Sequence, residues 1–420
     1  MSIDQVTRTI IGLLEKSWGV FLLALCVRVV IVVLGYDGGP QDTPEYDEIA
    51  HNLLDGQGFV ASNWWHGFEV RSWRPPFYPL FLASLYGSVG YSHSAVRLCQ
   101  CVIGALTAMV VMMLGKKLDP RIAPFCGILA AFYGPLASIS NEVMTETWFT
   151  FWGVVSVFFL VSGQIGKSGI VLGLGILTRP VGAFYLVALG VMVAIRRGNW
   201  PRRLWAVGIA LLVVLPWTIR NYAVHDVWPI LSSQGGFIVA RSNAVEPDWR
   251  KPHGWGVSKE FLKKMPSEIA RDRYWWREAR SFVIENPGAY LKLVAERFLR
   301  FWYFFHPWYN IWFMTVLPLF VFGFLHFWRS RDYLLPALYI LVSFLVLITL
   351  LYANSRFRLP LMPFFLIFAS AGIRHMLDVY GLRVTGSVVF GLAGINCLIG
   401  WQAQGLRDVL LFVLNAAGLR

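Results

Sequence analysis

The sequence has little charge for its length. Of its 420 residues only 15% are Asp, Glu, Lys or Arg, whereas 56% are hydrophobic and 16% aromatic, and the mean hydropathy is +0.56. Soluble globular domains carry about 25% charged residues. The composition therefore excludes a soluble enzyme, and it also excludes a disordered chain, a coiled coil and a repeat array.

Motifs of several familiar chemistries are also missing. There is no P-loop, no GxGxxG after a strand and no Ser-His-Asp pattern, so nucleotide hydrolysis and nicotinamide chemistry have no support. The eight histidines show no HExxH or HxxxH spacing, and no DxD triplet occurs. We therefore predict no required cofactor and no dedicated metal site, although His51 and His66 are close enough in sequence to Asp42 to leave a divalent metal open.

Cysteines and basic residues carry no separate function. The five cysteines all sit in apolar runs without CxxC spacing, which is typical of packing thiols. The formal net charge of +13 would suggest nucleic-acid binding in a soluble domain. In a membrane protein, basic cytoplasmic loops and anionic lipid headgroups explain it, so we expect membrane lipids and no nucleic acid as partners.

Long apolar runs recur from Trp18 to Trp401, and a spanning helix needs roughly 20 such residues. The predicted fold class is an all-α polytopic membrane protein with surface helices in its first outer loop and a larger helical outer loop. About eleven spans fit, near residues 18–35, 95–115, 122–139, 147–163, 169–195 as two short helices, 204–219, 310–328, 333–352, 359–373 and 384–401. We divide the chain into a catalytic membrane module (1–219, with the first outer loop 36–94), an outer loop region (220–300) and C-terminal helices (301–420).

The positive-inside rule orients these spans. The basic stop at residues 116–121 marks the cytoplasm, so an uncleaved first span places the amino terminus inside and residues 36–94 outside. The segment 169–195 is predicted to break at Thr178-Arg179-Pro180, because a single crossing would leave the four arginines of 196–203 outside. In the outer loop, 267–285 and 290–305 are predicted to be amphipathic helices, and 406–419 is a candidate interfacial helix.

Under this threading, ionisable residues gather at the outer ends of the spans. Charged groups at membrane depth are costly, so their clustering suggests a shared polar cavity. The set comprises Asp42, Glu45, Asp47, Glu48, Arg71, Arg74, Glu142, Glu146, Arg179, Arg220, Arg356 and Arg358.

Three members of this set have alternative interpretations. Asp42 precedes a predicted surface helix (41–54) and, with Glu45, can form a capping box, or it can be a catalytic carboxylate held by that cap. Arg74 lies in a stiff arginine and aromatic turn and is either a phosphate ligand or an interfacial anchor. A solvated loop acid is the simpler interpretation of Glu142, whereas Glu146 abuts an apolar span.

These residues resemble a family, the GT-C membrane glycosyltransferases, and in particular the branch with protein O-mannosyltransferases and the lipid A aminoarabinose transferase. The match covers most of the chain. Its motifs are Asp42, Tyr46, Glu48 and Ile49 after span one, Arg74-Pro75, Glu146 at span four, Arg179 in the broken segment, and the segments 216–222 and 355–360. Where the family usually has a second acid after the Asp, this chain has Thr43.

The resemblance implies inverting transfer of a sugar from a polyprenyl-phosphate carrier to a hydroxyl on a lipid, glycan or protein acceptor, outside a bacterial cytoplasmic (inner) membrane. Asp42 would be the general base, with Glu146 orienting substrate. Arginines would stabilise the lipid-phosphate leaving group without a metal, namely Arg74, Arg179 and either Arg356 or Arg358. Substrate or acceptor contacts are assigned to Tyr46, Glu48, His51, Arg220, Tyr274, Trp275 and Trp276.

Two rival functions stay open at this point. A carrier or flippase for a polyprenyl-linked lipid would also need interfacial arginines and broken helices, but it predicts comparable polar groups on both faces. A glycan ligase or polymerase would differ only in using a diphosphate-linked donor. The residues do not identify the sugar or the acceptor.

Overall fold

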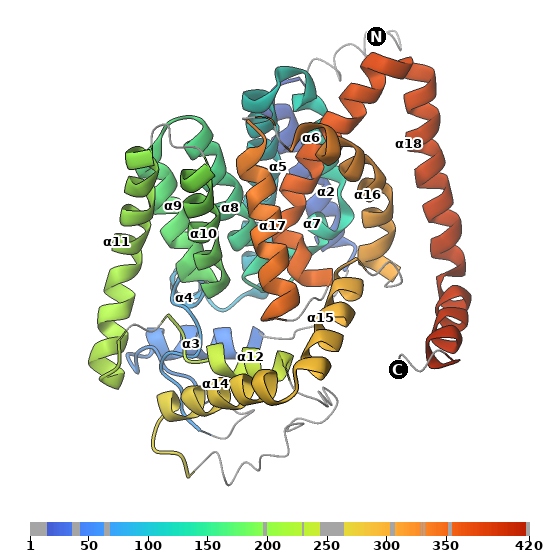
Figure 1. Ribbon diagram of the computed structural model, residues 1–420. Coiled ribbons are helices and arrows are strands. Elements are labelled where there is room, and N and C mark those ends of the chain that lie inside the picture. Colours follow the sequence, from blue (N-terminus) through green and yellow to red (C-terminus); the bar gives the residue numbers. More distant parts are fainter. Residues whose placement is uncertain are drawn as a thin grey trace.

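In the computed structural model the chain is a bundle of helices with a layer of shorter helices across one end (Figure 1). The structure describes residues 15–35, 43–62, 68–195, 200–228, 231–243, 264–302, 307–328, 330, 332–351 and 355–416. Within those ranges the only β pairing is an isolated antiparallel bridge between Ala61 and Val70. This agrees with the predicted all-α class.

The bundle is built from apolar helices whose side chains face either each other or the surface. Its first half comprises α2 (Ser17–Val33), α5 (His93–Leu118), η1 (Pro120–Ile122), α6 (Ala123–Phe132), α7 (Gly134–Ser138), η2 (Ile139–Asn141) and α8 (Glu146–Val161). Its second half comprises α9 (Ile165–Thr178), η3 (Pro180–Ala183), α10 (Phe184–Ile195), α11 (Trp200–His225), α16 (Pro307–Phe327), α17 (Leu334–Thr349), η4 (Ser355–Leu361) and α18 (Met362–Ala416).

Not all of these helices are long enough to cross a bilayer alone. Among the described residues three helices are long and apolar enough to cross a bilayer, namely 93–118, 204–225 and 356–399. A fourth passes if the pair 120–132 and 134–141, bent by 59°, forms one span. Seven further apolar helices are shorter, so the number of eleven spans stays a prediction.

Two breaks in the helical course have clear local causes. α9 ends at Thr178, Arg179 is extended (φ −145°, ψ 125°), and Pro180 begins η3, so the predicted break in 169–195 is confirmed. Proline removes a backbone donor and disfavours the helical conformation of the residue before it. In α18, Gly381 has φ +75°, and the chain turns back there (Figure 1). The predicted helix at 406–419 is not separate, because α18 continues to Ala416.

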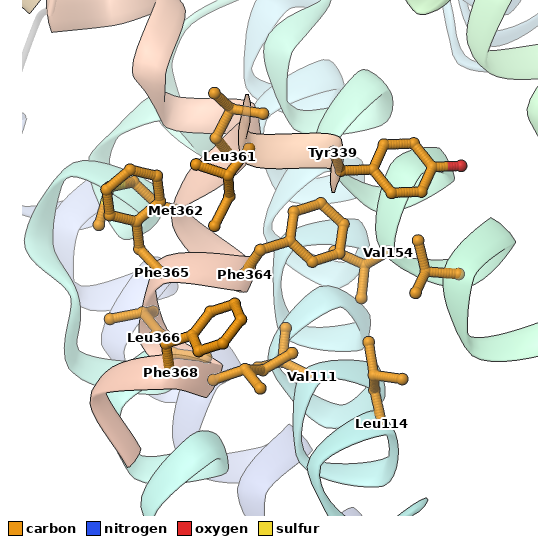
Figure 2. Close-up of a cluster of buried hydrophobic side chains, with 14 of the residues drawn as sticks. Val111, Leu114, Val154, Tyr339, Leu361, Met362, Phe364, Phe365, Leu366 and Phe368 are labelled. Atoms are coloured by element: carbon orange, nitrogen blue, oxygen red, sulfur yellow. The ribbon is translucent and has the colours of Figure 1, made fainter. Parts of the chain in front are cut away.

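The core lies where the first part of α18 is surrounded by other helices. Phe364, Phe365 and Phe368 are fully buried there, and Figure 2 shows them beside Val111, Leu114, Val154 and Tyr339. Phe320 of α16 stacks on Phe365 with ring centroids 4.1 Å apart. Each such aromatic side chain buries on the order of 150–250 Å².

The end layer consists of the surface helices. They are α3 (Thr43–Leu54), α4 (Phe77–Val89), α12 (Gly235–Ser242), α14 (Glu268–Glu285) and α15 (Pro287–Phe301). The predicted helix 267–285 is confirmed as α14, with Ser267 as its N-cap, whereas the second one begins at Pro287 and ends at Phe301. Proline at the first helical position is favourable because its missing N–H would be unpaired there.

A cluster of hydrogen bonds, called the polar clasp from here on, joins residues 71–72 of the first outer loop to α11 and α14. Glu268, at the start of α14, accepts the backbone N–H groups of Arg71 (2.9 Å) and Ser72 (3.2 Å) and the hydroxyl of Ser233. From the end of α11, Arg220 donates to the Arg71 carbonyl at 2.6 Å. His225 lies 2.8 Å from the Ser72 hydroxyl. The backbone just before Arg74 is therefore held by two separate helices.

Asp272 of α14 is expected to make the stability of the end layer depend on pH. Its carboxylate accepts the Gly236 N–H at 2.6 Å, and burial, with a smaller contribution from Glu268, raises its pKa to about 6. The folded chain favours the protonated form of Asp272, so protonation of this carboxyl group stabilises the fold. This stabilisation is complete below about pH 4 and is lost as the pH rises through about 6. We expect Asp272→Asn to remove that decline, measured as Tm against pH in detergent, while Asp332→Asn at an exposed site retains it.

Candidate active site

Glu146 forms the centre of a buried ion cluster. Its Oε1 atom lies 2.6 Å from Nη1 of Arg179 and 2.6 Å from Nη2 of Arg356, and Nε of Arg356 donates to it at 2.7 Å. The Glu146 side chain is 1% exposed and the two arginines 19% and 20%. A buried carboxylate is tolerated only when it is paired, and here two cations share one acid. The cluster carries a net positive charge.

Local structure explains how these three side chains meet. Glu146 is the first residue of α8, where the helix dipole favours a carboxylate. Arg179 lies in the break between α9 and η3, so its side chain extends from the end of a helix. Arg356 belongs to η4, the short turn between α17 and α18. Each side chain of the cluster therefore comes from a different connection between two helices.

Aromatic rings hold the guanidinium of Arg179. It lies over Phe149 (5.9 Å to the ring centroid) and Phe357 (5.6 Å), and its Nη1 is 3.4 Å from the Thr145 hydroxyl. Cation–π contacts of this kind stabilise a cation while leaving its N–H groups able to donate. The arrangement presents a planar set of donors suited to phosphate.

A second ion pair joins the first outer loop to α3. Both Nε and Nη2 of Arg74 lie 2.6 Å from Oε2 of Glu45, with side-chain exposures of 12% and 5%. The guanidinium also lies 4.9 Å from the ring centroid of Tyr46 and donates to its hydroxyl at 3.4 Å. Tyr46, predicted as a substrate contact, therefore contacts a predicted phosphate ligand, and Glu45, predicted as part of a capping box and of the outer ionisable set, is the ion-pair partner of Arg74.

The two ion clusters are connected through the start of α3. The Thr43 hydroxyl donates to the Val143 carbonyl at 3.2 Å, three residues before Glu146. Asp42, the predicted base, and His66 lie outside the described residues. The residue that follows Asp42 in the chain thus contacts the loop that carries Glu146.

Arg358 lies apart from Glu146 although it is only two residues from Arg356. It is 2% exposed, donates to the Phe301 carbonyl and stacks 3.4 Å from the ring centroid of Phe313. Of the two arginines that the sequence offered as phosphate ligands, the geometry favours Arg356. Arg356 and Arg358 are the second and fourth residues of η4, and residues two apart in a 3₁₀ helix point in different directions because side chains align only every three residues.

The other predicted contact residues are distributed around the end layer. Glu48 accepts the Ser62 N–H at 2.7 Å, and His51 lies 2.8 Å from the Asp47 carbonyl, so neither is in the ion clusters. Arg220 is engaged by the clasp described above rather than facing a free surface. Trp276 is 46% exposed, and Tyr274 is half-buried. Trp275 is 5% exposed and packs on Val239 and Ala240, so it offers no free face to a sugar, contrary to expectation.

Sequence analysis missed several buried polar residues near the site. Arg28, in the middle of α2, is 1% exposed and donates to the Ala24 carbonyl at 3.0 Å. A charge inside an apolar span was the available signal for it. Gln100 in α5 is fully buried and contacts the loop before Glu146. Its position within a long apolar run was a weaker signal.

The described residues contain no group of three His, Cys, Asp or Glu side chains suited to a metal ion. The acids near the cluster are engaged by arginines instead. Arg74, Arg179 and Arg356 are the positive charges of the two ion clusters.

Several known proteins are similar to this chain. No protein-family model matches it. The undecaprenyl phosphate-α-4-amino-4-deoxy-L-arabinose arabinosyl transferase of Pseudomonas paraeruginosa is 25% identical over 411 residues, covering 90% of this chain and 64% of that protein. The Pseudomonas aeruginosa protein of the same name is 26% identical over 238 residues, covering 51% and 42%. The chain thus spans less than two thirds of these curated relatives.

Solved structures share its arrangement of helices. ArnT from Cupriavidus metallidurans in the apo state superposes with a TM-score of 0.53 at 17% identity, covering 88% of this chain and 62% of that one. The oligosaccharyltransferase of Archaeoglobus fulgidus, in a complex with zinc and sulfate, gives 0.55 at 14%, covering 91% and 53%. The chain has the GT-C membrane fold.

A third solved structure shares this fold. ArnT bound to undecaprenyl phosphate matches this chain with a TM-score of 0.52 at 16% identity, over 95% of this chain and 72% of that one. The predicted fold class is confirmed, and the chain is a multi-pass membrane protein with apolar helices. Glu146, Arg179 and Arg356 lie at the ends of apolar helices, and Glu45 and Arg74 lie in the first outer loop.

Proposed function

We propose that this protein transfers a sugar from a polyprenyl-phosphate donor to a hydroxyl acceptor at the outer face of a bacterial cytoplasmic membrane. The observation that carries the proposal is the convergence of Arg179 and Arg356 on the buried Glu146, with Arg74 attached through α3 to the same loop. The aminoarabinosyl transferase of Pseudomonas paraeruginosa, whose match covers 90% of the chain, supports the donor class.

The arginines suit a leaving group that gains negative charge. When the sugar departs, the carrier phosphate changes from a diester to a monoester and gains negative charge. Preorganised hydrogen-bond donors stabilise that developing charge best in a site from which water is excluded. Glu146 holds two of the guanidinium groups without neutralising the cluster, because one carboxylate faces two cations. No metal is needed for this part of the reaction.

The attacking hydroxyl needs a general base. We assign this role to Asp42, which would accept the proton of the acceptor hydroxyl as its oxygen attacks the anomeric carbon. The bond between the anomeric carbon and the phosphate oxygen of the carrier breaks at the same time, with inversion. Its neighbour Thr43 is bonded to Val143 in the Glu146 loop, which supports this assignment. Glu146 would then fix the arginines and orient the substrate.

The acceptor would enter beside α12 and α14 of the end layer. Trp276 of α14 provides an exposed indole for stacking on a sugar ring, and Tyr274 a half-exposed phenol. Glycan, lipid and protein acceptors all carry the required hydroxyl. The acceptor class therefore has to be identified by experiment.

Purified protein in lipid nanodiscs, given a panel of polyprenyl-phosphate sugars and a crude envelope extract as acceptor source, tests the proposal. We expect free polyprenyl phosphate to be released from one donor, detected by mass spectrometry, and lost in Arg356→Met. Release from polyprenyl diphosphate sugars alone would favour the ligase alternative. No release from any donor, together with movement of a labelled lipid between leaflets, would favour the carrier alternative.

The proposed orientation makes a separate prediction. In a variant lacking the five native cysteines, Glu69→Cys in the first outer loop and Lys117→Cys in the last turn of α5 place one exposed thiol at each end of the bundle. We expect an impermeant thiol reagent added to intact cells to label Glu69→Cys, and to label Lys117→Cys only after the membrane is opened. The opposite pattern would place the ion clusters on the cytoplasmic side.

A further inference from the structure

A buried glutamine contacts the loop that carries Glu146. The carboxamide of Gln100, in α5, donates through Nε2 to the carbonyls of Ser140 (3.0 Å) and Glu142 (2.6 Å). Its side chain is 0% exposed. Both carbonyls belong to the turn between the bent α6–α7 pair and α8, so Gln100 fixes the backbone just before the ion cluster.

The same carboxamide is fixed from the opposite side by Tyr78. The phenol donates to Oε1 of Gln100 at 2.9 Å, and the ring, also 0% exposed, packs edge-on against Tyr46 with centroids 5.0 Å apart. Tyr78 is the second residue of α4, four positions after Arg74. Tyr46 is the side chain on which the Arg74 guanidinium rests.

These contacts form one continuous path between the two ion clusters. It runs from Arg74 through Tyr46 and Tyr78 to Gln100, and then through the backbone of 140–142 to Glu146. Every hydrogen-bonding group of the Gln100 carboxamide that the path uses is buried. In a low-dielectric interior such bonds are strong and costly to leave unmade, so they define one geometry.

We propose that Gln100 and Tyr78 are positioning residues that set the spacing between Arg74 and the Glu146 cluster. This inference rests on the proposed function, in which both clusters act on one donor phosphate. Neither residue contacts the reacting groups in the proposal. Catalysis depends steeply on alignment, and a displacement of about 1 Å can cost up to about 100-fold in rate.

The hydrogen bond between Tyr78 and Gln100, called the bridge from here on, can be removed from either side by Tyr78→Phe or Gln100→Met with little change in side-chain volume. We expect each to lower kcat for polyprenyl phosphate release about tenfold, while the Kd for polyprenyl phosphate changes less than threefold. The double variant should be no slower than Gln100→Met alone, because both substitutions break the same path. A rate per folded molecule equal to that of the wild type in both single variants would overturn the proposal.

Tyr86→Phe is the matched control. Tyr86 is a buried tyrosine on the same helix whose hydroxyl donates to Asp47 at 2.6 Å, and Asp47 also contacts Tyr91 and His93, which follow the end of α4. We expect Tyr86→Phe to lower Tm about as much as Tyr78→Phe and to leave kcat unchanged. If both tyrosine variants slowed turnover equally, the role would be general stability rather than positioning.

Hydrogen–deuterium exchange separates failure of this inference from failure of the proposed function. Amides in 139–146 should exchange faster in Tyr78→Phe and Gln100→Met than in Tyr86→Phe or the wild type. Faster exchange without any donor turnover by the wild type would support the bridge and contradict the proposed reaction. Unchanged exchange in both bridge variants would contradict the bridge even in an active enzyme.

Discussion

Asp42→Asn is expected to abolish sugar transfer while leaving donor binding nearly unchanged. An amide cannot accept the proton of the attacking hydroxyl, and loss of a general base typically costs about 10²–10⁴-fold in rate. The measurement is release of free polyprenyl phosphate by mass spectrometry, with binding of polyprenyl phosphate measured separately. Turnover like that of the wild type would remove Asp42 from the mechanism.

This substitution also distinguishes the catalytic role of Asp42 from a capping role. Asparagine is as good an N-cap as aspartate, so helix α3 (Thr43–Leu54) should survive the change. If capping were the only role, Asp42→Asn would be active and Asp42→Ala would lose stability. Asp55→Asn, an exposed acid just beyond the same helix, is the control for a change of charge in this loop.

Glu146→Gln is expected to reduce both stability and transfer. Without the carboxylate, Arg179 and Arg356 remain close together in a site where Glu146 itself is 1% exposed, and their repulsion is uncompensated. Removing one member of a buried ion pair costs about 3–5 kcal/mol, and the partial exposure of the arginines favours the lower value. We expect a Tm several degrees lower and at least about 100-fold slower polyprenyl phosphate release.

The control for this experiment is Glu142→Gln, which changes the charge of the same loop four residues earlier. We expect its Tm and turnover to stay close to those of the wild type. Glu146→Asp adds a test of geometry, since it keeps the charge but shortens the side chain by one methylene. If Glu146→Gln turned over normally at a temperature where it is folded, the cluster would be structural and the arginines would need no carboxylate.

The sequence by itself was sufficient for the helical class, for the break at Arg179-Pro180 and for the surface helix after Asp42. Each of these depends on short-range physics, namely apolar runs of spanning length, the missing donor of proline and the amphipathic spacing of α3. Charge bias between loops also placed Glu146, Arg179 and Arg356 within one predicted set of twelve ionisable residues, although they are far apart in the chain.

Only the tertiary structure decided which groups are partners. Arg356 reaches Glu146 across 210 residues while Arg358 packs on Phe313, because a 3₁₀ turn separates their directions. Trp275 is covered by α12, and Gln100 joins α4 to the Glu146 loop. Pairings of this kind depend on how helices pack against each other, and the hydrophobic pattern of one helix does not specify the partner that covers it.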